Sequence, residues 1–184
     1  MTPEYHRPVT PEQEQADFWS FIDVAVGRIG DELPEVDRRA MRLVLTLHRL
    51  TSMLVYDLES SVHRPRGWSW PGFRVLFVLW LAGPAEPTRI AELTGMSRAA
   101  VSALIKTLER DGLLLRSPAE SDRRSVRLSL TDLGRKAIAG AFAAHNEREQ
   151  DWAATLSTSE QEQLTRLLEK MIAGPAAAVA RRRA

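Results

Sequence analysis

Residues 86–112 most constrain the possible fold, because they hold two short helical patterns separated by a very short turn. The first pattern, "EPTRIAELTG", has a proline at the first helical position and ends at Gly95. The second, "SRAAVSALIKTLERDG", begins at Ser97, a residue type that caps helix N-termini, and ends at Gly112. Two short helices joined by a tight turn that contains glycine predict a helix-turn-helix.

The stretch after this motif predicts a β-hairpin with a charged tip. "LLLRS" at 113–117 and "SVRLSLT" at 125–131 are strand-like, and a polar turn, "PAESDRR", connects them. Apolar and polar residues alternate in the second run, which places Val126, Leu128 and Leu130 on one face. Helix, turn, helix and hairpin in this order form a winged helix-turn-helix.

Long helical patterns flank this region, so we predict a mostly α fold with a small β-hairpin. The helix over 35–63 is apolar on more than one side. It is therefore either the central helix of a larger core or a helix that also packs between subunits. The helices predicted outside the helix-turn-helix cover residues 11–33, 35–63, 71–82, 132–154 and 157–171.

Composition narrows the class of protein. The chain has 184 residues and no cysteine, which excludes disulfides, thiolate metal sites and thiol-based redox sensing. No apolar run approaches the roughly 18 residues of a membrane span. The N-terminus lacks the basic start and apolar core of an export signal, so we expect a cytoplasmic protein. The net charge is +1, yet residues 88–135 hold nine basic and six acidic side chains.

The residues that carry metal or catalytic chemistry in other proteins form no such pattern here. The sequence has no nucleophile elbow, phosphate-binding glycine loop or pair of catalytic acids. We therefore expect no enzymatic activity, no cofactor and no metal. Four histidines lack the spacing of metal ligands: His6, His48, His63 and His145.

The second helix of the helix-turn-helix has an outward face suited to base edges in the major groove of DNA. Arg98 suits guanine, Ser102 suits either base type, and Ala99 or Ala103 suits a thymine methyl group. An ordinary solvated helix face is the alternative interpretation. When the apolar stripe of this helix points inward, the outward residues are small or hydrogen-bonding: Arg98, Ala99, Ser102, Ala103 and Lys106.

Neighbouring residues suit the DNA backbone and the minor groove. Lys106 and the hydroxyls of Thr88 and Ser97 are placed for phosphates, which fix position without reading sequence. At the hairpin tip, Arg123 and Arg124 can reach the narrow and strongly negative minor groove. A surface hairpin made soluble by its charge is the alternative for these two arginines.

Three segments together resemble the MarR (multiple antibiotic resistance regulator) family. "IAELTGMSRAAVSALIKTLERDGLL" resembles the helix-turn-helix of that family, and "LSTSEQEQLTRLLEKM" resembles its closing dimerisation helix. "GLLLRSPAESDRRSVRLSLTDLGRKA" resembles its wing, with the Asp-x-Arg turn and the Leu-Thr-x-x-Gly ending at Asp122, Arg124, Leu130, Thr131 and Gly134. The resemblance covers about residues 36–173, whereas residues 1–33 depart from the shorter family members.

The resemblance implies a homodimer held by the first and last helices. Its two winged domains would bind a pseudo-palindromic operator in double-stranded DNA, with half-sites roughly 10 bp apart. Arg124 would be the arginine in the minor groove, and Arg123 is the second candidate. Regulators of this family are mostly repressors, which a small molecule releases by binding between the dimer helices and the winged domain.

The resulting domain organisation has five parts. The winged helix-turn-helix occupies residues 65–135, and dimerisation helices precede and follow it. The remaining residues are expected to be flexible. In chain order the parts are 1–10 (flexible N-terminus), 11–64 (N-terminal helices), 65–135, 136–173 (C-terminal helices) and 174–184 (flexible tail).

An aromatic cluster near the predicted domain junction indicates a ligand pocket. Three aromatic residues lie within six positions, which suits an apolar pocket with a few polar groups. The resemblance implies phenolic or carboxylate aromatic effectors, which His48 or Arg49 would meet. Core packing of the tryptophans and a structural ion pair of the arginine are the alternatives. The candidate pocket residues are His48, Arg49, Tyr56, Trp68, Trp70 and Phe73.

The leading hypothesis is therefore a homodimeric, sequence-specific DNA-binding transcriptional repressor that a small aromatic ligand releases. Two alternatives remain open. One is a winged-helix module for protein–protein interaction, whose basic tip meets an acidic partner. The other is a DNA binder without a ligand.

Overall fold

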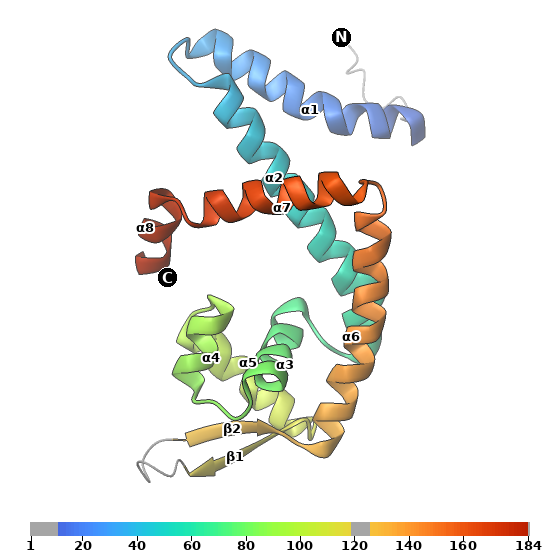
Figure 1. Ribbon diagram of the computed structural model, residues 1–184, viewed down its shortest axis with the longest axis vertical. Coiled ribbons are helices and arrows are strands. Elements are labelled where there is room, and N and C mark those ends of the chain that lie inside the picture. The colour runs from blue at the N-terminus through green and yellow to red at the C-terminus, as the bar shows by residue number, and fades with distance from the viewer. Residues whose placement is uncertain (1–10, 119–125, 184) are drawn as a thin grey trace, which may run out of the picture. The chain divides into compact units, whose positions relative to one another are not determined.

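The computed structural model describes residues 11–118 and 126–183 (Figure 1). The predicted fold class, mostly α with a small hairpin in a winged helix-turn-helix, is confirmed. Among the described residues, no helix combines the length and apolarity needed to cross a membrane. The helices are α1 (Pro11–Glu32), α2 (Arg38–Leu58), α3 (Trp70–Ala82), α4 (Pro87–Thr94), α5 (Arg98–Arg110), α6 (Asp132–Ala153), α7 (Thr158–Ile172) and α8 (Pro175–Arg183), and the strands are β1 (Leu114–Pro118) and β2 (Val126–Leu130).

The chain divides into two compact units between Tyr56 and Asp57. The helix predicted over 35–63 is present, because α2 continues directly into a π-helical turn, η1 (Glu59–His63), and a 3₁₀ turn, η2 (Arg64–Arg66), follows. These turns belong to the second unit because Val62 and His63 are buried in it, and η1 contacts α3 and α6.

The first unit contains α1 and α2, which two ion pairs connect. Asp23 pairs with Arg42 at 2.5 Å, and Asp31 pairs with Arg38 at 3.0 Å. Much of the apolar surface of α2 is nevertheless exposed, since the side chains of Leu43, Val44, Leu50 and Met53 lie at the surface of the chain. The apolar stripe of α2 is therefore not the centre of a core within its own chain.

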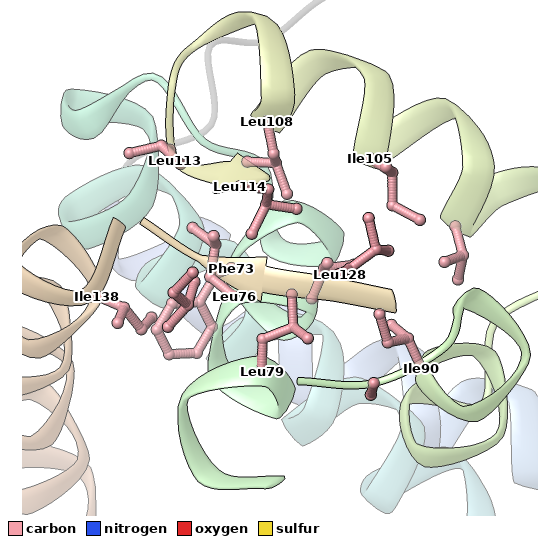
Figure 2. Packing of buried hydrophobic residues seen from close by; sticks show 14 of the residues in the cluster. Phe73, Leu76, Leu79, Ile90, Ile105, Leu108, Leu113, Leu114, Leu128 and Ile138 are labelled. Atoms are coloured by element: carbon pink, nitrogen blue, oxygen red, sulfur yellow. The ribbon is translucent and has the colours of Figure 1, made fainter. Parts of the chain in front are cut away.

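The core of the second unit joins the helix-turn-helix to the hairpin (Figure 2). Figure 1 shows the two strands beneath α3, α4 and α5 in that view. Apolar side chains from α3, α4, α5, α6 and β2 converge, and each is nearly or fully shielded from solvent because the side chains pack closely. Among the most deeply buried of these residues are Leu76, Ile90, Val101, Ile105, Leu128 and Ile138.

The hairpin is antiparallel, with Leu114 opposite Leu130 and Pro118 opposite Val126. The predicted alternation is confirmed, because Leu128 and Leu130 are buried. Ala85, just before α4, pairs with Leu128 through N–H···O distances of 3.0 and 2.8 Å. This bridge attaches β2 to the start of the helix-turn-helix.

The junction of the hairpin with α6 depends on Thr131 and Gly134. The Thr131 hydroxyl donates to the Gly112 carbonyl at 2.7 Å and accepts from the Gly134 N–H at 2.9 Å, so it caps α6 and holds the end of α5. Gly134 is buried, and a Cβ there would overlap the Leu113 carbonyl oxygen. A side chain at this position is therefore excluded by the backbone of the chain itself.

The C-terminal helices agree with the sequence prediction up to residue 172. Ser157 and Glu160 form the predicted capping box at the start of α7. Beyond it, however, the chain forms α8 (Pro175–Arg183), where we expected a flexible tail. The reason is that "PAAAVARRR" combines a proline at the first helical position with alanine, the strongest helix former.

A buried histidine pair connects η1 to α6. His63 is fully buried, its ring stacks on Phe73 with centroids 4.2 Å apart, and its Nε2 lies 3.4 Å from Nδ1 of His145. Its Nδ1 has no hydrogen-bond partner among the described residues. Burial lowers the pKa of His63 to about 4, and the neighbouring His145 and Arg66 act in the same direction, whereas Glu59 opposes them.

We expect Gly134→Ala to destabilise the protein by at least about 2 kcal/mol, because the added methyl group must displace the Leu113 backbone. Gly140→Ala, in the same helix, is the matched control. Nothing lies within 4 Å of a Cβ at Gly140, so this change should stabilise α6 by roughly 0.5–1 kcal/mol. Urea unfolding followed by circular dichroism measures both, and equal effects would contradict the close approach.

We expect His63 to make the free energy of unfolding depend on pH between about 6.5 and 4. Its pKa is about 4 when folded and 6.5 in the unfolded chain, so acid protonates the unfolded state first and stability falls as the pH falls. Once the pH is low enough to protonate His63 in both states, the free energy of unfolding has fallen by about 3 kcal/mol. Urea unfolding across this range should show a steeper loss for the wild type than for His63→Phe; parallel curves would refute it.

Candidate nucleic-acid interface

Helix α5 presents one polar face to solvent and one apolar face to the core. Of the predicted inward stripe, Val101, Ile105 and Leu108 are buried and Leu104 is half-buried. Ser97 caps the helix by accepting from the Ala100 N–H at 3.2 Å. The five outward residues, Arg98, Ala99, Ser102, Ala103 and Lys106, are all exposed.

The positive charges on this face are not neutralised by neighbouring acids. Within the described part of the chain, neither Arg98 nor Lys106 forms an ion pair. By contrast, Arg89 on α4 pairs with Glu92 at 3.0 Å, and Arg110 at the far end of α5 pairs with Asp111 at 3.2 Å. The first three turns of α5 therefore present two cations without ion-pair partners, Arg98 and Lys106, beside small side chains. A negatively charged groove can approach such a surface closely.

The predicted phosphate-binding hydroxyls lie at the starts of the two helices. Ser97 is exposed, and its oxygen already accepts from the backbone, so its own O–H remains a donor. Thr88 is half-buried in the first turn of α4. Both hydroxyls therefore lie at helix N-termini, where anions are favoured.

The stem of the wing is attached to the helix-turn-helix by arginines. Arg116 on β1 donates to Glu109 on α5 at 2.6 Å, and this hydrogen bond raises the pKa of Arg116. Arg127 on β2 donates to the Pro84 carbonyl at 2.9 Å. Of the arginines in the hairpin, Arg116 and Arg127 are therefore occupied within the chain. Asp122, Arg123 and Arg124 lie outside the described residues.

The six predicted ligand residues do not line one pocket within either unit. His48, Arg49 and Tyr56 are exposed on α2 in the first unit. Trp68 is buried in the core of the second unit and borders a hollow with Arg66 and Lys136. Only Trp70 and Phe73 share a pocket.

This aromatic pocket has a volume of about 480 Å³ and lies among α3, α4 and α6. Its rings are stacked nearly parallel: the planes of Trp70 and His145 differ by 10°, and those of Phe73 and His145 by 16°. At its polar edge, Glu149 accepts from His145 Nε2 at 3.1 Å and from the Asn146 side chain at 3.0 Å. The full lining is Trp70, Phe73, Arg74, Phe77, Val78, Leu81, Ala82, Leu93, Thr94, Phe142, His145 and Glu149.

Most of this lining was not predicted from the sequence, because residues 136–153 were assigned only to dimerisation. Phe142, His145 and Glu149 are spaced three and four residues apart, so they lie on one face of α6. Phe77 is likewise four residues after Phe73 on α3. These spacings were visible in the sequence, but the distance in sequence between α3 and α6 concealed that the two faces meet.

Comparison with known proteins agrees with this geometry. Residues 68–126 match the sequence model of the MarR family. The HTH-type transcriptional regulator YwaE of Bacillus subtilis is 36% identical over 132 residues, which are 72% of this chain and 77% of YwaE.

Two solved structures share the fold. A mutant MarR from E. coli complexed with operator DNA has a TM-score of 0.67 at 19% identity, over 78% of this chain and 97% of that one. Bordetella bronchiseptica BpsR, whose structure concerns the regulation of DNA binding by 6-hydroxynicotinic acid, has a TM-score of 0.64 at 24% identity, over 70% and 91% of the two chains. From its sequence and its winged helix-turn-helix, this chain belongs to the MarR family of transcriptional regulators.

Proposed function

We propose that this MarR-family regulator is a homodimeric repressor that binds a pseudo-palindromic operator and that a small aromatic molecule releases. The observation that carries the proposal is the exposed face of α5, where Arg98 and Lys106 lack ion-pair partners among the described residues beside alanine and serine side chains. A helix of this kind fits the major groove, and close approach to base edges requires small residues.

In the proposed complex, Arg98 and Ser102 read bases while Ala99 and Ala103 contact thymine methyl groups. Lys106, Ser97 and Thr88 bind phosphates, which set the position of α5 in the groove. Arg124, with Arg123 as second candidate, enters the adjacent minor groove from the tip of the wing. The attachment of the wing stem through Arg116 and Arg127 supports a fixed spacing between these two contacts.

The homodimer is supported by apolar surface that a single chain leaves in water. On α7, Leu164, Leu167 and Met171 lie on one face and are exposed. On α2, Leu43 and Met53 are exposed as well. A second copy that covers both helices would remove this surface from solvent, as the family resemblance implies.

The aromatic pocket supports a small-molecule effector. Stacked rings with a few polar groups at the edge are typical of sites for flat organic ligands. The regulation of BpsR by 6-hydroxynicotinic acid is a parallel from a protein of the same fold. Binding that favours one dimer geometry would shift the population away from the form that fits DNA.

The two alternatives predict different behaviour. A protein–protein module would bind acidic partners and show no preference among duplex sequences. A DNA binder without a ligand would bind its operator with an affinity that small aromatic molecules leave unchanged. Operator binding should also weaken with salt, by roughly 0.9 log units per log unit of salt for each phosphate contact.

We expect Arg98→Ala to reduce operator affinity by about 1–3 kcal/mol and to relax base preference at one position in each half-site. Arg124→Ala should weaken binding strongly without changing the dimer. Arg110→Ala is the control, since this arginine is on the same helix but pairs with Asp111. Fluorescence anisotropy on duplexes selected from a random library measures all three; unchanged affinity in both test variants would refute the interface.

We expect Leu167→Glu to raise the dimer dissociation constant by about 30-fold or more, because it places a charge in the proposed apolar interface. Leu133→Glu is the control, since Leu133 is similarly exposed (59% against 53%) but lies at the start of α6. Sedimentation velocity across a dilution series measures the constant, and equal behaviour of the two variants would contradict α7 as an interface helix.

A further inference from the structure

One arginine connects the aromatic pocket to the turn that precedes the recognition helix. Arg74, on α3, lines the pocket and donates from Nη2 to the backbone carbonyl of Thr94, the last residue of α4. Terminal carbonyls of a helix have no partner within the helix, so a side-chain donor satisfies one of them. Thr94 is buried, with only 2% of its surface exposed, and it lines the same pocket.

The tethered carbonyl is close in sequence to the start of the DNA-binding face. After Thr94 come Gly95, with φ of +65°, and Met96, and then Ser97 caps α5. Gly95 adopts a left-handed conformation that glycine reaches without strain, and the N–H groups of Gly95 and Met96 donate to the Glu92 and Ala91 carbonyls at 3.3 and 3.2 Å. The Arg74 hydrogen bond is therefore a connection between α3 and a turn whose position sets where α5 begins.

The pocket offers this guanidinium to a ligand. Within residues 11–118 and 126–183, Arg74 forms no ion pair, and the only hydrogen bond it donates there goes to Thr94. The Thr94 carbonyl accepts one N–H from Nη2, whereas a carboxylate can accept two parallel N–H···O bonds from one edge of the guanidinium. In a pair with a carboxylate both partners are charged and two N–H···O bonds can form, so an acid in the pocket competes well for Arg74.

The rest of the lining specifies the remainder of the ligand. Phe73, Phe77 and Phe142 provide flat apolar surfaces for an aromatic ring, with Phe77 and Phe142 stacked at a centroid distance of 5.4 Å. Glu149 lies on α6 with one side open to solvent, and its carboxylate accepts hydrogen bonds. The complementary molecule is a hydroxylated aromatic acid, with its carboxylate toward Arg74 and its hydroxyl toward Glu149.

We propose that Arg74 is the ligand-operated switch of this regulator: an aromatic carboxylate in the pocket takes the guanidinium from the Thr94 carbonyl and releases the turn before α5. The proposal rests on the proposed function and adds the residue through which the effector acts. Operator binding and acid binding then oppose each other, and by linkage each weakens the other by the same factor.

The test uses the full-length protein, a selected operator duplex, 4-hydroxybenzoate as probe and 4-hydroxybenzamide as its uncharged counterpart. We expect the acid to lower the operator affinity of the wild type at least tenfold and the amide to lower it less than twofold. Arg74→Met should bind the operator as weakly as the acid-saturated wild type and should not respond to the acid. Arg64→Met, which removes an exposed arginine paired with Glu59, should behave as the wild type.

Amide hydrogen exchange in the wild type gives a readout that does not depend on a variant. Saturating 4-hydroxybenzoate should accelerate exchange at Gly95 and Met96 and leave α7 unchanged. If Arg74→Met is poorly folded, this measurement still decides the question, and Arg74→Lys, which keeps the charge but loses the two-pronged grip, should respond less than the wild type.

Three outcomes would overturn the switch: equal responses to acid and amide, full acid sensitivity in a folded Arg74→Met, or no change in exchange at the turn while acid is bound. Failure of the wild type to bind 4-hydroxybenzoate at all would overturn the ligand class. These outcomes are distinct from failure of the proposed function, in which the wild type would select no operator duplex from the library.

Discussion

The packing of the apolar stripe of α5 against the hairpin is the interaction on which the rest of the second unit depends. Ile105 and Leu108 point into the core that Leu128 and Leu114 also enter, and all four are almost completely buried (Figure 2). Because a helix has a fixed rotation per residue, burying this stripe determines which residues of α5 lie on the opposite, exposed face. The exposed surface of α5 is thus a consequence of the core.

Further contacts then position the hairpin, α5 and α6 relative to one another. The Ala85–Leu128 bridge and the Arg127 hydrogen bond attach β2 to the segment before α4, and Arg116 attaches β1 to α5. Gly134 lets α6 pass against the Leu113 carbonyl. The hairpin, α5 and α6 are consequently connected through both backbone and side-chain contacts.

Much of this was readable from local patterns. Ser97, Thr131 and Ser157 each cap the helix that their spacing predicted, and the period-two alternation of β2 matches its burial. Capping and alternation are local physics, involving residues within four positions of each other. The helix predicted over 35–63 is present, but it changes from α-helical to π-helical after Leu58, where His63 is buried against Phe73 and His145.

The amino-acid sequence by itself determined the order of elements, the inward stripe of α5 and the positive residues left on its outer face, because each follows from the periodicity of a single helix or strand. Only the tertiary structure decided that Trp70, Arg74 and Glu149 share a pocket, that Trp68 belongs to the core, and that Arg74 reaches the Thr94 carbonyl. The physical reason is that these residues lie far apart in the sequence, from 20 positions for Arg74 and Thr94 to 79 for Trp70 and Glu149, and no local periodicity records which faces of separate helices will meet.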